Sequence, residues 1–214
     1  MKRGTEAASR IIVAGLGAVL CGGVLADEAT LEFAGGTSHK TAFVATDVTL
    51  PGTSDFTWDA WVKPTDVELA ENRIMGQTDW ANEGRLLLEI RQGNDSGKVA
   101  KFALLYRVNV ANKRTIGTTQ LAAGTWYHVA VTRSGTALSL YVNGTLEATA
   151  NDYAGPLPAE PFSFAHMFSG ALAEVRAWNR ALSAEEIAAV KDRRVGGTEN
   201  GLVGCWALNN GMIP

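Results

Sequence analysis

The clearest feature of the chain is an alternation of apolar and polar residues that begins near residue 30. A period of two is the pattern of β-strands that bury one face. In the stretch TALSLYVNGTLEATA, the apolar residues Leu138, Leu140 and Val142 share one face. Asn143 and Gly144 follow them, and both residue types tolerate the positive φ angles of a two-residue hairpin turn. The stretch therefore predicts a β-hairpin.

Other stretches with the same alternation predict further strands, and turn-forming residues separate them. The predicted strands lie at residues 29–35, 56–64, 72–78, 85–92, 101–108, 127–133, 171–179 and 201–208. The strand at 127–133 is joined to the hairpin by the turn Ser134-Gly135, so these three strands form an antiparallel meander. Many short antiparallel strands predict an all-β domain of two sheets packed face to face.

One stretch, LSAEEIAAVKDRR, departs from this pattern and predicts a short C-terminal helix. Ser183 can cap its first turn, and Glu186 three residues later completes a capping box. Ile187 and Val190 form its apolar stripe, and cationic residues stand at its C-terminal end, where the helix dipole favours them. One short helix attached to a sandwich leaves the fold class all-β.

The N-terminal residues predict an export signal. Cationic residues precede an apolar stretch at 11–25, and small residues have the spacing that a signal peptidase requires for a cut after Ala26. The apolar stretch is too short for a stable membrane span of about 20 residues, although an uncleaved anchor is the alternative. We expect a signal peptide at 1–26, one domain at 27–214, and a secreted, periplasmic or cell-surface location.

Removal of this signal changes both the charge and the cysteine content. It takes away three of the 19 cationic and one of the 22 acidic side chains, which leaves 16 and 21 and a net charge of −5. An acidic domain without a basic run is a poor candidate for binding nucleic acid or an anionic membrane surface. Only Cys205 would remain, and its apolar neighbours predict an inert, buried thiol without an intrachain disulfide.

Five segments of the chain together resemble a known family. In order, they read LEFAGG, FTWDAWVKP, AGTWYHVAVTRSGTALSLYVNG, SGALAEVRAWNRALSAEEI and GLVGCWALNNG, across about residues 29–211. This order resembles the laminin-G-like jelly-roll domains of the concanavalin A-like lectin/glucanase superfamily. The resemblance implies a two-sheet antiparallel jelly-roll sandwich with one short C-terminal helix. Similar domains occur mostly as binding or adhesion modules of secreted and surface proteins, and relatives include lectins and glucan-cleaving enzymes.

The histidine at the start of the meander raises the question of a catalytic site. His128 shares a strand face with Ala130, while Tyr127, Val129 and Val131 share the face that we assign to the core. The resemblance makes the Trp-x-His element part of the scaffold. No Gly-x-Ser-x-Gly nucleophile elbow occurs in the sequence. We therefore expect a structural role for this histidine.

Two tryptophans in the strand at 56–64 must lie on opposite faces. Trp58 and Trp61 are three residues apart, so only one of them can enter the core between the sheets. The resemblance gives that place to Trp61, which shares its face with Asp59.

An enzyme of the glucan-cleaving kind requires two carboxylates across the scissile bond. The relatives carry theirs on one strand in a pattern resembling Glu-x-Asp-x-Glu, and this spacing does not occur here. Asp59, Glu89 and Glu174 are single strand acids without an acidic partner at i+2 or i+4. We therefore expect no enzymatic activity. A carboxylate pair assembled from different strands is the alternative that the sequence leaves open.

Calcium is the cofactor that the resemblance suggests. Some modules of this superfamily hold calcium through backbone carbonyls and one acidic residue near the last strands, since a hard ion prefers oxygen ligands. The segment before the helix often reads Asp-Glu-Val in similar domains, and here it reads Ala173-Glu174-Val175. Glu174 is therefore the candidate metal ligand, and the scattered His and Cys residues argue against zinc.

Sugar binding requires a flat aromatic face beside a few polar groups, usually in loops at the edge of a sandwich. The stretch GQTDWANEGR is the best candidate, with the residues Asp79, Trp80, Asn82 and Arg85. Two aromatic residues beside polar neighbours are secondary candidates, Tyr106 and Tyr153. The alternative is that Trp80 folds back over the sheet edge and that the polar residues are solvated loop residues.

These patterns predict an exported, non-catalytic module that binds a glycan or a cell-surface partner through loops around Trp80. The rival is a protein-interaction or structural surface domain without affinity for sugars, which would pair through an exposed strand edge. A glycoside hydrolase is the third alternative.

Overall fold

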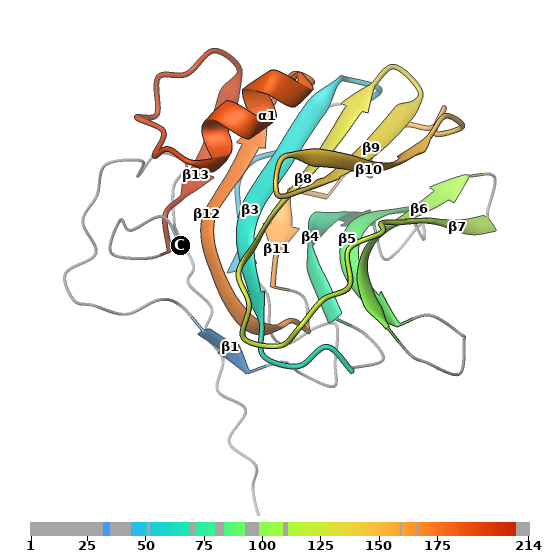
Figure 1. Ribbon diagram of the computed structural model, residues 1–214. Coiled ribbons are helices and arrows are strands. Elements are labelled where there is room, and N and C mark those ends of the chain that lie inside the picture. The colour runs from blue at the N-terminus through green and yellow to red at the C-terminus, as the bar shows by residue number, and fades with distance from the viewer. Residues whose placement is uncertain are drawn as a thin grey trace, which may run out of the picture.

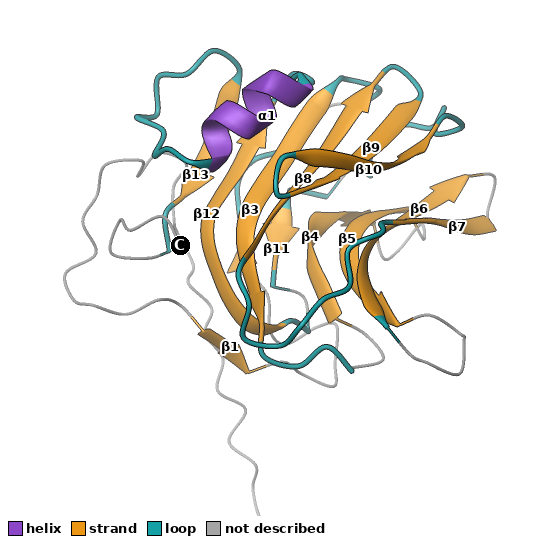
Figure 2. Ribbon diagram, in the orientation of Figure 1, coloured by secondary structure: helices purple, strands orange, loops and turns teal. Residues whose placement is uncertain are grey.

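The computed structural model describes residues 32–34, 44–50, 52–68, 72–79, 84–92, 99–108, 111–158, 160–165 and 167–208. In this part the chain forms two β-sheets packed face to face, with one helix outside the larger sheet (Figure 1, Figure 2). The expected signal peptide at 1–26 lies outside the described residues. None of the described helical structure is long and apolar enough to cross a membrane.

The larger sheet, sheet A, has seven strands in the order β1-β12-β3-β8-β9-β10, with β13 also paired to β12. Its strands are β1 (Glu32–Ala34), β3 (Phe56–Pro64), β8 (Tyr127–Ser134), β9 (Ala137–Val142), β10 (Thr145–Ala150), β12 (Ser169–Trp178) and β13 (Leu202–Trp206). All these strands pair in the antiparallel sense. Because β3 lies between β8 and β12, the sheet joins distant parts of the sequence.

The smaller sheet, sheet B, has six strands in the order β2-β11-β4-β5-β6-β7, again antiparallel. Its strands are β2 (Val44–Ala45), β4 (Asn72–Asp79), β5 (Gly84–Gln92), β6 (Ala100–Val108), β7 (Ala111–Ile116) and β11 (Ser163–Phe164). In Figure 1 the long strands of this sheet are visibly curved. The two packed antiparallel sheets confirm the predicted all-β jelly-roll sandwich.

The hydrophobic core lies between the two sheets and is filled by alternate residues of the strands. In sheet B, for example, Leu86, Leu88 and Ile90 of β5 pack there beside Phe102 and Leu104 of β6, and each is at most 2 % exposed. Burial of side chains of this size contributes about 1.5–3 kcal/mol each. The alternation that predicted these strands therefore also places their core faces correctly.

The predicted hairpin forms with the predicted turn. Asn143 and Gly144 have φ angles of 50° and 82°, and Val142 pairs directly with Thr145. Both central residues are thus in the left-handed region that a two-residue turn requires. Three strands, β2, β7 and β11, were not predicted, because two of them have only two residues and the third is almost entirely exposed.

The helix α1 (Ala184–Lys191) begins at the predicted cap. The backbone N–H of Glu186 donates to Ser183 Oγ at 3.2 Å, and the backbone N–H of Ser183 donates to Glu186 Oε2 at 2.8 Å. Ile187 and Val190 are buried in a second hydrophobic cluster on the outer side of sheet A. That cluster also includes Ala130, Tyr141, Trp178, Leu182, Val195 and Cys205. The helix therefore covers part of sheet A (Figure 2).

The two tryptophans of β3 lie on opposite faces, but the core position belongs to Trp58. Its ring is 0 % exposed and stacks on Phe56 with 4.3 Å between the ring centroids. Trp61 lies on the outer side of sheet A, where its Nε1 donates to the backbone oxygen of Lys191 at 3.1 Å. The expectation that Trp61 fills the core was therefore wrong, and its ring instead supports the C-terminal end of α1.

Cys205 is buried, as its apolar neighbours predicted. Its sulfur, however, is disulfide-bonded. The expectation of a thiol without a disulfide applied to the chain after removal of residues 1–26, so it stays a prediction. The other cysteine of the sequence, Cys21, lies outside the described residues.

Candidate functional site

The candidate site lies at the end of sheet B where β4 and β5 are joined. The last pair of this hairpin joins Asp79 to Gly84. Trp80 and Asn82 belong to the connection after that pair and lie outside the described residues, as does the side chain of Asp79. Arg85 is the predicted residue of this group whose side chain is described, and it is half-buried. The structure therefore shows where the two strands end that the predicted loop connects.

Arg85 lies on the face of sheet B that is turned away from the core, which we call the outer face. Strand side chains alternate between faces, and Leu86 and Leu88 point into the core. Arg85 therefore points outward, and by the same alternation so does Arg107, which follows the core residue Tyr106 on β6. Leu86 and Tyr106 are directly paired, so the two arginines stand on adjacent strands at the same level.

Cationic side chains recur across the outer face. They are Arg73 on β4, Arg85 and Arg91 on β5, Lys101 and Arg107 on β6, and Arg114 on β7, and we call these six the cationic face. Among the described outer-face residues the acidic one is Glu89, and its Oε1 lies 2.7 Å from Nε of Arg114. Arg73, Arg85 and Arg107 each take part in further interactions, and Arg73 is only 6 % exposed.

The floor of the cationic face is apolar. Leu87 and Leu105 form a direct pair at its centre and are 0 % and 1 % exposed. Neither belongs to the core between the sheets or to the cluster under α1. Glu89 and Arg73 on the same face are 3 % and 6 % exposed, so the centre of the cationic face is buried.

Among these six residues, the sequence pointed to Arg85 as a candidate contact and to Arg107 as a polar neighbour of Tyr106. The signal for this face was also present, because in RLLLEIR and KFALLYRV the positions between the core residues include Arg91, Lys101 and Arg107. How these cations align across strands depends on the strand order and register, which the alternation does not specify.

The two tyrosines predicted as secondary sugar contacts meet inside the core. Tyr106 and Tyr153 are 4 % and 2 % exposed, and their rings pack edge to face with 5.9 Å between centroids. Tyr106 Oη donates to Asp152 Oδ1 at 3.0 Å, and the same carboxylate pairs with Lys113. Burial raises the pKa of Tyr153 to about 12, although the Arg133 guanidinium lies 4.8 Å from its ring centroid. Both rings are therefore buried in the core, where they pack against each other.

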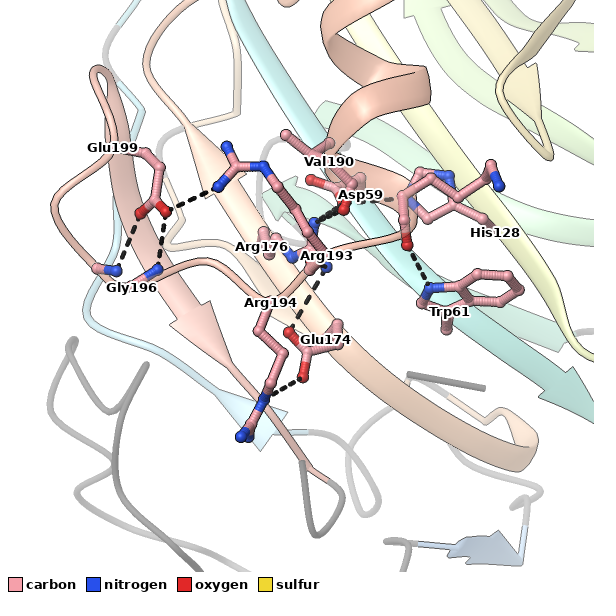
Figure 3. Close-up of polar contacts among 12 residues, drawn as sticks. Asp59, Trp61, His128, Glu174, Arg176, Val190, Arg193, Arg194, Gly196 and Glu199 are labelled. Carbon is pink, nitrogen blue, oxygen red and sulfur yellow. Dashed lines mark hydrogen bonds and ion pairs between the residues drawn. The ribbon is translucent and has the colours of Figure 1, made fainter. Parts of the chain in front are cut away.

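A buried polar network lies between sheet A and α1 (Figure 3). Asp59 is its centre: His128 Nε2 lies 3.2 Å from Oδ2, Arg176 Nη1 lies 3.3 Å from the same oxygen, and Trp178 Nε1 donates to Oδ1 at 2.7 Å. Burial alone would raise the pKa of Asp59, but the charge of Arg176 and the two hydrogen bonds outweigh it and lower the pKa below 3.8. His128 is 0 % exposed, so the structure gives it the structural role that was expected.

Glu174, the predicted metal ligand, faces two arginines (Figure 3). Its Oε2 lies 3.5 Å from Arg176 Nη2, and its Oε1 lies 3.8 Å from Arg194 Nε. The described residues contain no group of three or more His, Cys, Asp or Glu side chains that could hold a metal ion. Two guanidinium groups repel a cation, so this environment does not fit calcium at Glu174, and calcium elsewhere in the protein stays a prediction.

Solved structures of other proteins share the fold. A candidate carbohydrate-binding protein from Bacteroides ovatus is 24 % identical with a TM-score of 0.59, over 78 % of this chain and 48 % of that one. A SAP-like pentraxin from Limulus polyphemus is 18 % identical with a TM-score of 0.58, over 81 % and 89 % of the two chains. The binding domain of Paraclostridial mosquitocidal protein 1 is 15 % identical with a TM-score of 0.51, over 69 % and 39 %. The chain thus spans about half the length of the first of these proteins.

Sequence comparison identifies the family. No curated protein sequence matches the chain. The family model of the concanavalin A-like lectin/glucanases superfamily, however, matches residues 35–188, which is more than half of the chain. This match confirms the resemblance carried by the hairpin and by the strand-to-helix segment. The chain belongs to the concanavalin A-like lectin/glucanases superfamily.

Proposed function

We propose that the protein is an exported, non-catalytic module that binds glycans at the end of sheet B where β4 and β5 are joined. The observation that carries this proposal is the position of Arg85 beside Arg107 on the outer face, at the strand ends from which the Trp80 loop departs. An aromatic ring beside guanidinium donors is a combination that suits sugar rings and their polar substituents. Family membership supports the same class of function, because the fold carries binding modules as well as enzymes.

The placement of the described acidic residues supports a non-catalytic role. Glycoside hydrolysis requires two carboxylates that face one substrate. Asp59 and Glu174 are buried beneath α1, at 0 % and 2 % exposure. Glu89, on the outer face, is paired with Arg114. Within the described part of the chain, these strand acids therefore do not form an accessible pair.

Export and an extracellular site of action are part of this proposal. They rest on the N-terminal pattern of cationic residues, an apolar stretch and small residues before Ala26. Glycans of cell surfaces and extracellular matrices would then be the accessible ligands. Mass spectrometry of the N-terminus of the secreted protein tests this part, and an intact residue 1 in a cell-associated protein would contradict it.

The test of the binding function is a broad glycan and polysaccharide array probed with the purified protein. Parallel arrays contain calcium or a chelator, so the same experiment tests a calcium requirement. We expect binding to a restricted set of glycans. A folded protein that binds no glycan in either condition would refute the proposed function. Release of reducing sugars from the bound polysaccharides would contradict the non-catalytic part.

A specific observation favours a second candidate, an interaction with a protein partner. The strands β7 and β10 are edge strands of the two sheets, and their Ile116 and Leu146 are 48 % and 51 % exposed. Exposed strand edges with apolar side chains can pair with an added strand. Replacement of both residues by Lys should abolish such an interaction and leave glycan binding unchanged, and size-exclusion chromatography with the partner would separate the two functions.

A further inference from the structure

The two sheets meet along one side of the sandwich, where the strands β7 and β10 contact each other. β7 is the last strand of sheet B and β10 is the last strand of sheet A, so in the described part of the chain each has a sheet neighbour on one side only. Polar contacts cross from the edge of one sheet to the edge of the other. They form two groups, around Glu147 and Asp152, which together we call the seam.

Glu147 of β10 makes the first group of contacts. Its carboxylate accepts hydrogen bonds from the backbone N–H groups of Thr118 at 2.8 Å and Thr119 at 3.2 Å, and from the Thr119 hydroxyl. The register of β10 shifts at Glu147, and such bulges change the direction of a side chain. The chain directly after β7 approaches so closely that a Cβ added at Gly117 would lie 2.5 Å from Glu147 Oε2. The carboxylate therefore ties the edge of sheet A to the end of β7.

Asp152 makes the second group of contacts, two residues after the end of β10. Its Oδ2 pairs with Lys113 of β7, and its Oδ1 accepts a hydrogen bond from Tyr106 Oη of β6 at 3.0 Å. Both carboxylates of the seam thus come from the β10 side. Their donors belong to β6, to β7 and to the residues directly after β7.

The two carboxylates hold the seam best when they are ionised, because charged acceptors form stronger hydrogen bonds and a neutral carboxyl group no longer attracts a lysine. Burial raises the pKa of Glu147, but the hydrogen bonds from Thr119 and Thr118 outweigh it and lower the pKa below 4.5. The hydrogen bonds from Lys113 and Tyr106 lower the pKa of Asp152 below 3.8. Both contributions are therefore complete above these ordinary values and are lost as the pH falls through the lower folded values.

The other titratable and charged groups around the seam keep their charge in this range of pH. Lys113 of β7 and Tyr106 of β6 face Asp152, and burial together with the Asp152 hydrogen bond raises the pKa of Tyr106. Arg114 of β7 points to the outer face of sheet B, and Tyr141 of β9 belongs to the cluster under α1. Lys191 of α1, the helix that contacts β10, pairs with the residue that follows it. Protonation of the seam in acid is thus protonation of its two carboxylates.

We propose that the seam is a joint that opens in acid: Glu147 and Asp152 hold the edges of the two sheets together at neutral pH, and their protonation separates β7 from β10 while the rest of the sandwich stays folded. This device is separate from the proposed glycan-binding function. Opening leaves two strand edges unpaired, and unpaired edges can accept an added strand. The half-exposed side chains of Ile116 and Leu146, directly before Gly117 and Glu147, flank this side of the sandwich.

The test is amide hydrogen exchange, followed by NMR between pH 7 and pH 3 and corrected for the intrinsic exchange rate. The amides of Thr118 and Thr119 report on the seam because they donate to Glu147. The amide of Val129, in β8 at the centre of sheet A, reports on global unfolding. We expect the protection of the two threonine amides to fall about tenfold or more below pH 4, as the loss of hydrogen bonds to a charged group implies. Protection at Val129 should stay higher and change less.

The variant Glu147→Gln/Asp152→Asn removes both ionisable groups of the seam. Its matched control is Glu32→Gln/Asp47→Asn, which removes two exposed acids, one of them on β1 at the opposite edge of sheet A. At pH 7 the first variant should exchange the Thr118 and Thr119 amides about tenfold faster than the wild type, with little further change in acid. The control variant should keep the wild-type profile.

Several results would overturn the proposal. Protection of Thr118 and Thr119 that is the same at pH 7 and pH 3 would show that the carboxylates do not control the seam. An equal fall at Val129 would show global unfolding in place of a local opening. Equal acceleration in the two variants would remove the specific role of Glu147 and Asp152. The wild-type profile decides the question even if the first variant does not fold.

Discussion

Trp178 Nε1 donates a 2.7 Å hydrogen bond to Asp59 Oδ1, and these two side chains, 119 residues apart in the sequence, are both buried between sheet A and α1. The other carboxylate oxygen of Asp59 faces His128 of β8 and Arg176 of β12. Arg176 in turn donates to the backbone oxygen of Val190 at 2.8 Å, near the end of α1. One carboxylate thus connects three adjacent strands and, through an arginine, the helix.

This arrangement predicts a large effect of Asp59→Asn on stability. The substitution leaves the buried charge of Arg176 without its carboxylate, and breaking a buried pair costs about 3–5 kcal/mol. The measurement is the free energy of unfolding in urea at pH 7. Asp47→Asn is the matched control, because Asp47 is exposed and should change that free energy by less than about 0.5 kcal/mol. A loss of less than about 1 kcal/mol for Asp59→Asn would contradict the assigned role.

Asp59 should also make the stability of the protein depend on pH in the acidic range. Its pKa is lowered in the folded protein, so the folded state keeps the carboxylate ionised where the unfolded chain already binds protons. Its contribution is complete above the ordinary pKa of 3.8 and is lost as the pH falls through the lower folded value. The stability difference between the wild type and Asp59→Asn should therefore shrink below pH 4.

The contribution of Glu174 to stability should depend on pH in the opposite sense to that of Asp59. Burial raises its pKa, and the charges of Arg176 and Arg194 offset this only in part. A raised pKa gives a contribution that is present below the ordinary value of 4.5 and is lost as the pH rises through the folded value. The variant Glu174→Gln cannot ionise, so it should gain stability relative to the wild type between pH 4 and pH 7. Urea unfolding at both pH values checks this, and a relative loss at pH 7 would show that the arginines favour the carboxylate.

The two tryptophans of β3 show how much the sequence could predict. The alternation requires opposite faces for Trp58 and Trp61, and the structure confirms this. The choice of face was also readable, because Trp58 alternates with Phe56 and Ala60 while Trp61 alternates with polar residues. The resemblance to a family suggested the reverse and was wrong at this position. Local alternation was the better guide, since it reports directly which face the strand buries.

The candidate site was less predictable than the core. The polar loop around Trp80 and Arg85 was recognised from composition, but the cationic face depends on the order and register of four strands. The sequence of β7 carries little apolar signal, because this edge strand is mostly exposed. Arg114 therefore could not be placed beside Glu89, with which it pairs. Long-range pairing of strands is decided by packing across the whole sandwich and not by local pattern.

The close packing of sheet B around Gly76 of β4 leaves no room for a side chain at this position. A Cβ built on this residue would lie 2.2 Å from the backbone oxygen of Leu86 and 2.9 Å from Cα of Leu87. These backbone atoms belong to the paired strand β5 and cannot move without disturbing the ladder. We expect Gly76→Ala to lower the free energy of unfolding by about 3 kcal/mol or more, at the upper end of the usual cost of overpacking.

The control for this prediction is Gly155→Ala. No heavy atom lies within 4 Å of the Cβ that would be added at Gly155, and its φ is not in the left-handed region. Its effect on the free energy of unfolding should stay within about 0.5 kcal/mol. Equal effects of the two substitutions would contradict the close contact between β4 and β5.

The most direct test of the central claim is the affinity of Trp80→Ala for a glycan that the wild type binds, measured by isothermal titration calorimetry. If the site lies where β4 and β5 are joined, loss of this ring should weaken binding about 30-fold or more, as for an aromatic hot spot. The control is Trp126→Ala, since that ring is half-buried before β8 of sheet A, with Lys63 Nζ 5.2 Å from its centroid. Loss of affinity in Trp80→Ala with unchanged affinity in Trp126→Ala would support the account. Unchanged affinity in a folded Trp80→Ala protein would contradict it.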